Sequence, residues 1–421
     1  MKRILFIFLF IQTQTIISQQ ENNFIHQALN TTDDAHAICL LQKAIAHNPR
    51  SYKGLFFLAN QYCKYGVYQH AIACYKKMIT HTPHSAQLHH NLGYNLKIAG
   101  YLDDAIESYK HALQIDPNYF HSEFACALTY LQKGDFENGW QWYNPYLKKN
   151  NLYAEQLRTW IINKELKGKT ILLRKQGGFG DTMQFVRYAQ VLHEMDAHVI
   201  VQESKPMLKL LSLCPYIDTL IPTKHNVPNH DDQTSLMALP AIFNSNEKTI
   251  PKNIPYLFAD KTLVEYWKKK LPKPGIKIGY CFIADLKNDE SRLPIAHRSV
   301  PLELLQKLQT SESIYWYNLH KDSTDFGDDF DKNNGAFMDT AAIIENLDLV
   351  ITVDTSIAHL AGALGKPVWL LLPFSTDWRW IHGRTDSPWY PTIKIFKQKT
   401  PFDWKTVIEH VAQALKELYE A

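Results

Sequence analysis

Residues 349–373 read LVITVDTSIAHLAGALGKPVWLLLP, and this stretch decides the fold expected for the C-terminal part of the chain. It begins with five apolar or β-branched residues, as expected of a strand that is buried on both faces. A polar turn at 354–356 leads into a short helix over 357–364, and a second apolar strand covers 368–372. This order of strand, turn, helix and strand predicts a βαβ unit and therefore a parallel sheet.

The turn of this unit, formed by Asp354, Thr355 and Ser356, is a candidate anion-binding site. Unpaired N–H groups and the helix dipole attract anions to a helix start, and ligands of parallel sheets bind beyond the carboxyl ends of the strands. Thr355 and Ser356 add hydroxyl donors, and His359 lies one turn inside the helix, able to lean toward the same place. In the alternative interpretation, Asp354 only caps the helix and His359 only packs.

A chain of 421 residues is long enough for two or three domains, each with its own core. Its formal net charge of +3 is nearly balanced, so neither nucleic acid nor an acidic membrane surface is an expected partner. Six cysteines are scattered without a CxxC pair, each in an apolar context: Cys39, Cys63, Cys74, Cys126, Cys214 and Cys281. We expect small buried side chains and a reducing compartment, the cytoplasm.

Residues 1–20 have the form of either a weak secretory signal or an ordinary first helix. A basic start at 1–3 precedes an apolar run at 4–11, and the bond between Ser18 and Gln19 is a tolerable but poor cleavage site. The apolar run is too short to span a bilayer as a helix, and no transmembrane segment is expected elsewhere. Export is therefore the alternative to a cytoplasmic location.

A period of 34 residues runs through residues 21–152. Leu58-Ala59, Gly66, Ala71, Tyr75 and Pro83 recur as Leu92-Gly93, Gly100, Ala105, Tyr109 and Pro117. Small residues such as Gly93 and Ala105 allow two antiparallel helices to cross closely, and Tyr109 fills the next gap. The spacing and residue types resemble the tetratricopeptide repeat. The pattern weakens around Asn144-Pro145, where we expect a transition into the next domain.

A stack of such repeats is expected to form an α-solenoid with a concave groove. Grooves of this kind usually hold a peptide or another protein. The alternative is a spacer that only packs on the next domain.

The remaining chain predicts two α/β halves, at 153–260 and 261–421. Apolar runs predict strands at 170–174, 198–202, 219–221, 276–282 and 314–319, and helices at 184–195, 208–213 and 341–346. Residues 224–255 are polar and contain four prolines, so we expect little regular structure there. Residues 404–419 carry apolar side chains at helical spacing and should form a closing helix.

The first strand of this region leads into a glycine-rich turn at 176–182. Glycines such as Gly178 and Gly180 permit close approach of the backbone to a ligand. The turn matches neither the GxGxxG dinucleotide pattern nor the P-loop, which disfavours a nicotinamide cofactor or an ATPase. Asp181 would lie at the helix start, where it is either a cap or a general base at the mouth of a cleft.

Two further features carry open alternatives. Arg298 is either a phosphate clamp or an ordinary surface arginine. Residues 374–391 combine many aromatic side chains with Arg and Asp, so they form either the rim of a ligand site or a tightly packed structural loop.

Five motifs resemble the bacterial domains of the heptosyltransferase type, glycosyltransferase family nine, which occur joined to tetratricopeptide repeats. They are QGGFGDTMQFVRY at 176–188, RSVPL at 298–302, DTAA at 339–342, DTSIAHLAGA at 354–363 and SPWY at 387–390. The resemblance covers nearly everything from Trp160 to the end. It implies a GT-B fold, with two Rossmann-like domains facing a cleft, and transfer from a nucleotide-sugar without metal or cofactor.

The resemblance also implies roles for single residues. In that family the aspartate of the Gly-Asp pair is the base on the acceptor hydroxyl, a role that falls on Asp181. The turn and the helix that bind the donor diphosphate in that family correspond to Asp354, Thr355, Ser356 and His359. Gly178, Gly180 and Arg298, singled out above by their own chemistry, complete the expected donor-binding residues. The chain departs from the family at Phe282 and Ala284-Asp285, where many relatives carry a Trp and a Gly-Asn, and only Lys287 is a candidate for the family's phosphate-binding lysine.

We therefore expect an inverting glycosyltransferase that moves a sugar from a nucleotide-activated donor to an acceptor hydroxyl. The repeats would recruit a protein or a glycan-carrier acceptor. The alternative from another class is a non-catalytic interaction scaffold with a degenerate transferase domain. The departure at Ala284-Asp285 favours the scaffold, and the intact Asp181 opposes it.

Overall fold

The computed structural model describes residues 18–152, 154–271, 274–284, 298–308, 313–323, 325–326 and 336–419. The chain divides into two compact units, residues 1–130 and 131–421. The apolar start of the possible signal and the segment that contains Asp285 and Lys287 lie outside the described residues.

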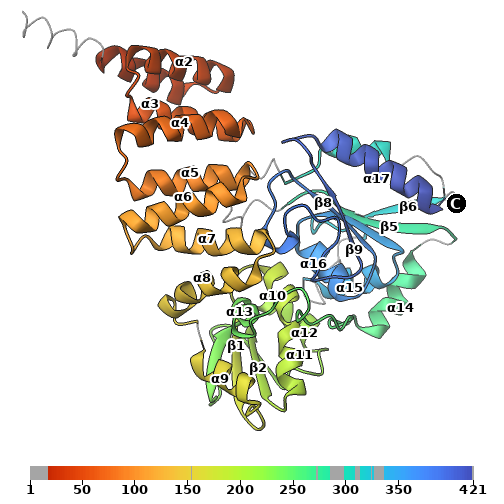
Figure 1. The fold of residues 1–421 in the computed structure, drawn as a ribbon. Helices are drawn as coiled ribbons and strands as arrows, with labels where there is room; N and C mark the ends of the chain where they lie inside the picture. Colours follow the sequence, from red (N-terminus) through yellow and green to blue (C-terminus); the bar gives the residue numbers. More distant parts are fainter. Residues whose placement is uncertain are drawn as a thin grey trace, which may run out of the picture. The chain divides into compact units, whose positions relative to one another are not determined.

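The first unit is a series of antiparallel helix pairs (Figure 1). Residues 18–30 are helical. The helices that follow are α2 (Asp34–His47), α3 (Tyr52–Lys64), α4 (Tyr68–His81), α5 (Ala86–Ile98), α6 (Leu102–Ile115) and α7 (Phe120–Gln132). Ser51 and Ser85, one period apart, cap α3 and α5 by accepting hydrogen bonds from Gly54 N (2.9 Å) and Leu88 N (3.3 Å).

The close helix crossing predicted for the repeat is confirmed between α5 and α6. A Cβ on Gly93 would lie 2.7 Å from Tyr109 Cε1 and 3.1 Å from the Ala105 carbonyl oxygen, so only glycine fits there. Tyr109 and Ala105 are fully buried. The 34-residue period therefore reflects the packing of one helix pair.

The second unit begins with α8 (Phe136–Lys149) and α9 (Glu155–Asn163). The transition into the next domain was expected around Asn144-Pro145, but the two units divide earlier, between residues 130 and 131, and α8 continues through Pro145. Trp140 on α8 is buried and donates to the carbonyl oxygen of Ser245 over 2.5 Å, which attaches the helix to the α/β part of the same unit.

The first sheet has four parallel strands in the order β3-β2-β1-β4. They are β1 (Thr170–Arg174), β2 (His198–Glu203), β3 (Thr219–Pro222) and β4 (Asp232–Ser235). The accompanying helices are α10 (Phe179–Phe185), α11 (Arg187–Glu194), α12 (Lys205–Leu211), η1 (Leu236–Ala238) and α13 (Leu239–Ile242). The single helix expected at 184–195 is instead two helices, α10 and α11, which meet at Val186. The first of them begins at Phe179, five residues before the expected start.

The second sheet has five parallel strands in the order β6-β5-β7-β8-β9. They are β5 (Ile276–Cys281), β6 (Ile314–Asn318), β7 (Leu349–Val353), β8 (Val368–Leu372) and β9 (Ile393–Lys397). The helices around them are α14 (Lys261–Lys270), η3 (Leu302–Lys307), α15 (Met338–Glu345), α16 (Ser356–Ala363), η4 (Trp378–Trp380) and α17 (Trp404–Tyr419). The predicted βαβ unit is confirmed as β7, α16 and β8.

One face of the second sheet forms a hydrophobic core with α17. Ile351 and Leu371 from the sheet pack with Val407, Ile408 and Val411 from the helix, and all five are 2% exposed or less. The closing helix predicted for residues 404–419 is therefore confirmed.

A further expectation is wrong in this region of the chain, and one is wrong in the repeats. Residues 224–255 are not irregular, because β4 and α13 lie within them. All six cysteines are free thiols, but Cys39 is exposed rather than buried.

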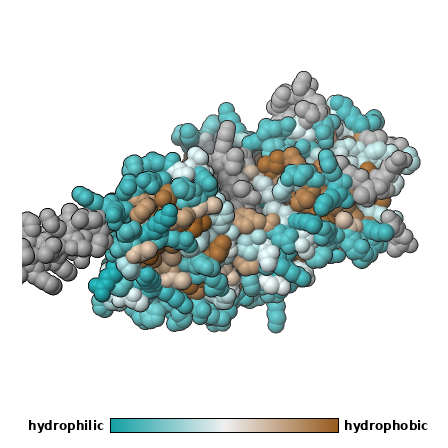
Figure 2. Space-filling view, turned by 90° about the horizontal axis from the view of Figure 1, so that it is seen from above, coloured by the Kyte–Doolittle hydropathy of each residue, from teal (hydrophilic) through white to brown (hydrophobic). Residues whose placement is uncertain are grey.

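Hydrophilic residues cover most of the surface in view in Figure 2, with smaller apolar areas between them. Among the residues described here, no helix combines the length and apolar character needed to cross a bilayer.

Candidate functional site

The carboxyl end of β7 leads directly into the helix start that the sequence singled out. Thr355 is the N-cap of α16, with extended backbone (φ −138°, ψ 173°), and its side chain accepts no hydrogen bond from the helix. Its hydroxyl instead lies 3.2 Å from the Thr352 hydroxyl, which donates to the Cys281 carbonyl oxygen. The first N–H groups of α16 are therefore not capped by Thr355, which suits an external acceptor.

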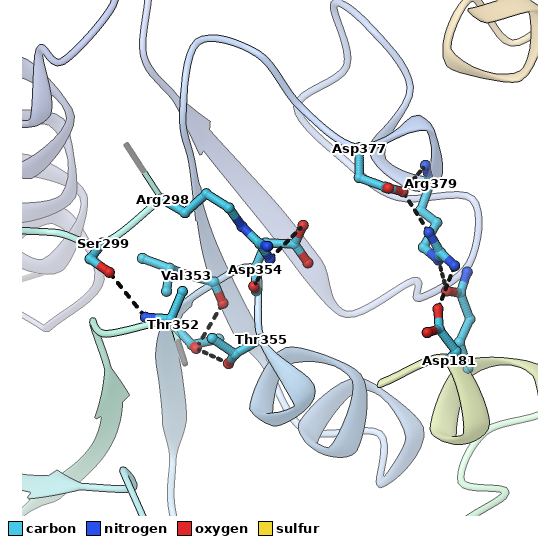
Figure 3. Close-up of polar contacts among 11 residues, drawn as sticks. Asp181, Arg298, Ser299, Thr352, Val353, Asp354, Thr355, Asp377 and Arg379 are labelled. Carbon is cyan, nitrogen blue, oxygen red and sulfur yellow. Dashed lines mark hydrogen bonds and ion pairs between the residues drawn. The ribbon is translucent and has the colours of Figure 1, made fainter. Parts of the chain in front are cut away.

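Arg298 and Asp354 lie together beside this helix start (Figure 3). Arg298 Nη2 donates to the Asp354 carbonyl oxygen over 2.7 Å and lies 3.7 Å from its carboxylate. Burial raises the pKa of Asp354, and the nearby Arg298 opposes that rise. The Arg298 side chain is 25% exposed and contacts the turn, so both interpretations of it, phosphate clamp and surface arginine, stay open.

Asp181 lies in the first turn of α10, as predicted. Its Oδ2 accepts a hydrogen bond from the backbone N–H of Gly178 over 2.7 Å, so the carboxylate caps the helix. Gly177 adopts φ +75°, and a Cβ there would lie 2.2 Å from Asp181 Oδ2. The glycine-rich turn thus makes room for this carboxylate.

The other oxygen of Asp181 is held by Arg379 from η4. Arg379 Nη2 donates to Asp181 Oδ1 over 2.5 Å (Figure 3). The same guanidinium donates from Nη1 to Asp377 Oδ1 over 2.8 Å and from Nε to Gln184 Oε1 over 2.8 Å. Arg379 is buried, with 10% of its side chain exposed, while 22% of the Asp181 side chain stays exposed.

His359 is buried beneath the same region. Its Nδ1 lies 2.9 Å from the Tyr390 hydroxyl, and its ring stacks on Trp380 with centroids 5.4 Å apart. Burial lowers the pKa of His359 to about 3, with a further contribution from Arg379. The imidazole is therefore neutral near pH 7, and its surroundings fit the packing interpretation better than direct contact with a ligand.

Glu203, the last residue of β2, connects α10 to the carboxyl end of the first sheet. It is fully buried at the end of β2, where Oε2 accepts from the Thr182 hydroxyl over 2.7 Å. Its Oε1 accepts from the N–H and hydroxyl of Ser204, and Lys175 Nζ lies 4.0 Å away. This buried network fixes the helix start that carries Asp181.

The aromatic loop after β8 is a packed structural element. Its rings are almost entirely buried: Trp378 is 7% exposed, Trp380 1%, and Trp389 and Tyr390 0%. They contact one another and Phe185 of α10 at centroid distances of 5.7–6.4 Å. Of the two interpretations left open, the packed loop is therefore confirmed.

The structure brings the predicted residues into two neighbouring groups. Asp354, Thr355, Ser356 and Arg298 meet at the start of α16. Gly178, Gly180 and Asp181 meet at the start of α10, and Gly180 contacts His359. No partner for Asp181 was predicted from the sequence, because Arg379 was noted only as part of an aromatic loop. The only local sign of this partner in the sequence is the pair of charged residues Asp377 and Arg379 among tryptophans.

Within the described ranges, no group of three or more His, Cys, Asp or Glu side chains could hold a metal ion.

Similarity to known proteins is found both for the repeats and for most of the chain. A family model for the tetratricopeptide repeat matches residues 86–119. Protein FlbA of Caulobacter vibrioides is 22% identical over 442 residues, covering 94% of this chain and 72% of that protein. A solved structure of MamA from AMB-1 is 24% identical with a TM-score of 0.29, covering 32% of this chain and 76% of its own. MamA from Desulfovibrio magneticus RS-1 is 15% identical with a TM-score of 0.29, covering 31% and 76%.

The chain therefore contains tetratricopeptide repeats, followed by an α/β region with parallel sheets. Repeats of this kind suggest a protein-interaction role.

Proposed function

We propose that the protein is an inverting glycosyltransferase of GT-B type, which transfers a sugar from a nucleotide-activated donor to an acceptor hydroxyl. Its repeats recruit the acceptor or a protein partner. The single observation that carries the proposal is the proximity of two helix starts, α10 with Asp181 and α16 with Thr355, each following a strand of a different parallel sheet. The two helices are in direct contact, because Gly180 of α10 lies against the ring of His359 of α16.

The start of α16 is the proposed site for the donor diphosphate. Uncapped N–H groups at Ser356 and Ile357, the helix dipole and Arg298 favour negative charge there. These groups would also stabilise the charge that develops on the leaving nucleoside diphosphate.

Asp181 is the proposed base. It accepts the proton of the acceptor hydroxyl while that oxygen bonds to the anomeric carbon of the sugar. The bond from the anomeric carbon to the diphosphate breaks on the opposite face and leaves its electron pair on the diphosphate, so the configuration inverts. A carboxylate provides about four lone-pair positions, and Gly178 and Arg379 occupy one each, so acceptor positions remain for a substrate hydroxyl.

A panel of nucleotide-sugars tests the proposal. Thermal shift with UDP-, GDP-, ADP- and dTDP-sugars identifies the donor, and release of the nucleoside diphosphate measures turnover. D181A should abolish turnover and retain donor binding, whereas R298A should weaken donor binding. D386A is the matched control, because Asp386 pairs with Arg384 and should leave both measurements unchanged. Unchanged turnover in D181A would exclude the base assignment.

The second candidate function is an interaction scaffold with an inactive α/β region. One observation favours it: both oxygens of Asp181 already have protein partners, Gly178 and Arg379, as a purely structural carboxylate would. Donor binding without release of nucleoside diphosphate, across a range of acceptors, would support the scaffold.

A further inference from the structure

We propose that Arg379 is a positioning residue for Asp181, and that the base is assembled by both α/β halves rather than by one. This inference rests on the proposed function. Asp181 belongs to α10, which follows β1 of the first sheet, and Arg379 belongs to η4, which follows β8 of the second sheet. The two residues are 198 positions apart in the chain and share a hydrogen-bonded ion pair.

The guanidinium of Arg379 is held in a single orientation by three acceptors. Nε donates to Gln184, Nη1 to Asp377 and Nη2 to Asp181, at 2.8, 2.8 and 2.5 Å. Because the guanidinium is planar and its donors form a fixed fork, three such contacts fix both the position and the plane of the group. The rings of Trp378 and Phe185 lie 4.9 and 5.4 Å from its central carbon.

The charge of Arg379 is balanced within the cluster. Burial alone would lower its pKa, but Asp377 and Asp181 outweigh burial and raise the pKa above its usual value. Arg379 therefore stays charged, and Asp377 is a second carboxylate that holds the guanidinium in place beside Asp181.

This arrangement determines the orientation of the Asp181 carboxylate. Gly178 N–H holds one oxygen from within α10, and Arg379 holds the other from the opposite half. With either donor alone, the side chain could rotate about the remaining hydrogen bond. With both, the carboxylate plane is fixed, which keeps the proton-accepting oxygen in line with the acceptor hydroxyl.

Arg379 acts through Asp181, so the decisive variants separate positioning from donor binding. R379A removes the fork, and R379K keeps the charge but cannot reach the three acceptors at once. Arg384 provides the matched control, since it lies in the same loop and also contacts two carboxylates, Glu247 and Asp386, at 2.9 and 2.8 Å. R384A therefore removes an arginine that also pairs with two carboxylates, but leaves the contacts of Asp181 unchanged.

Crystal structures of R379A and R384A give a measurement that does not depend on turnover. In R379A, we expect the Asp181 side chain to leave its wild-type orientation, and in R384A to keep it. An Asp181 side chain that stays in place in R379A overturns the inference, whatever the enzyme does. If R379A does not fold, the same comparison is made with R379K.

Turnover provides the second measurement once a donor is identified. We expect kcat of R379A to fall about 100-fold with the KM for the donor unchanged, as for a misplaced catalytic group. Added guanidinium should restore part of kcat in R379A but none in the double variant D181N/R379A. A raised donor KM with unchanged kcat would make Arg379 a donor ligand and overturn its role as a positioning residue. Absence of turnover in the wild type counts against the proposed function alone, because the crystal structures still decide the position of Asp181.

Discussion

Gly180 lies directly against the ring of His359. A Cβ at Gly180 would stand 2.7 Å from His359 Cδ2 and 3.3 Å from Nε2, closer than side chains normally approach. Since Gly180 is in α10 and His359 in α16, this contact sets how closely the two candidate helix starts approach each other. G180A should therefore force the helices apart and lower the free energy of unfolding of the second unit by about 1–3 kcal/mol.

Tryptophan fluorescence can measure this effect selectively, because all ten tryptophans lie in residues 131–421. G178A is the matched control. Gly178 has φ −87°, which any residue adopts, and a Cβ there would only reach Asp181 Oδ2 at 3.7 Å. Equal stability of G180A and G178A in urea would mean that the α10–α16 contact is looser than the structure shows.

Buried neutral His359 should make the second unit less stable in acid. Its pKa is about 3 in the folded chain, because of burial, against 6.5 in the unfolded chain. As pH falls below 6.5, the unfolded state binds a proton that the folded state does not, so the free energy of unfolding falls by up to about 1.4 kcal/mol per pH unit. The free energy of unfolding continues to fall until about pH 3, and His359 does not lower it well above pH 6.5.

H359Q should remove this dependence. The difference in unfolding free energy between pH 7 and pH 5 should be smaller in H359Q than in the wild type, by about 2 kcal/mol. Urea denaturation followed by tryptophan fluorescence at the two pH values measures it. Identical pH dependence in both proteins would show that His359 takes up its proton in the folded state.

The strands of the two sheets were predictable where they are continuous apolar runs. Residues 349–353 and 368–372 are buried along their whole length in the middle of the second sheet, and their bounds were predicted to the residue. β4 was missed because it consists of Asp-Gln-Thr-Ser and pairs on one side only, with β1. Its assignment depends on backbone pairing with a distant strand, which side-chain hydropathy does not reveal.

The candidate site was predictable only within each half. Asp181 and the 354–356 turn were recognised because helix-start chemistry is local, involving neighbours along the chain. The pairing of Asp181 with Arg379, and the contact of Gly180 with His359, join residues nearly 180 or more positions apart. They follow from how α10 of the first half meets α16 and η4 of the second, and no period or local motif in the sequence encodes that contact.

Tyr109 offers a test of the repeat packing. Its ring fills the space beside Gly93, but its hydroxyl is buried and has no hydrogen-bond partner among the described residues. Burying an unpaired hydroxyl costs about 1–3 kcal/mol, so Y109F should raise the thermal stability of the repeats. Circular dichroism at 222 nm measures this transition, since the first unit has no tryptophan. A lower melting temperature in Y109F would mean that the hydroxyl is hydrogen-bonded, for instance to water.

Arg187 should be a sensitive buried position of the second unit. It is 1% exposed, and it donates to the carbonyl oxygens of Trp389 (2.5 Å) and Pro251 (3.2 Å) and to the Tyr256 hydroxyl (2.6 Å). R187M leaves these acceptors unsatisfied, so the free energy of unfolding should fall by about 3–5 kcal/mol. R384M is the control, and its partly exposed ion pairs predict a loss below about 1 kcal/mol. Tryptophan fluorescence in urea compares the two, and similar losses would show that the buried hydrogen bonds of Arg187 contribute little to stability.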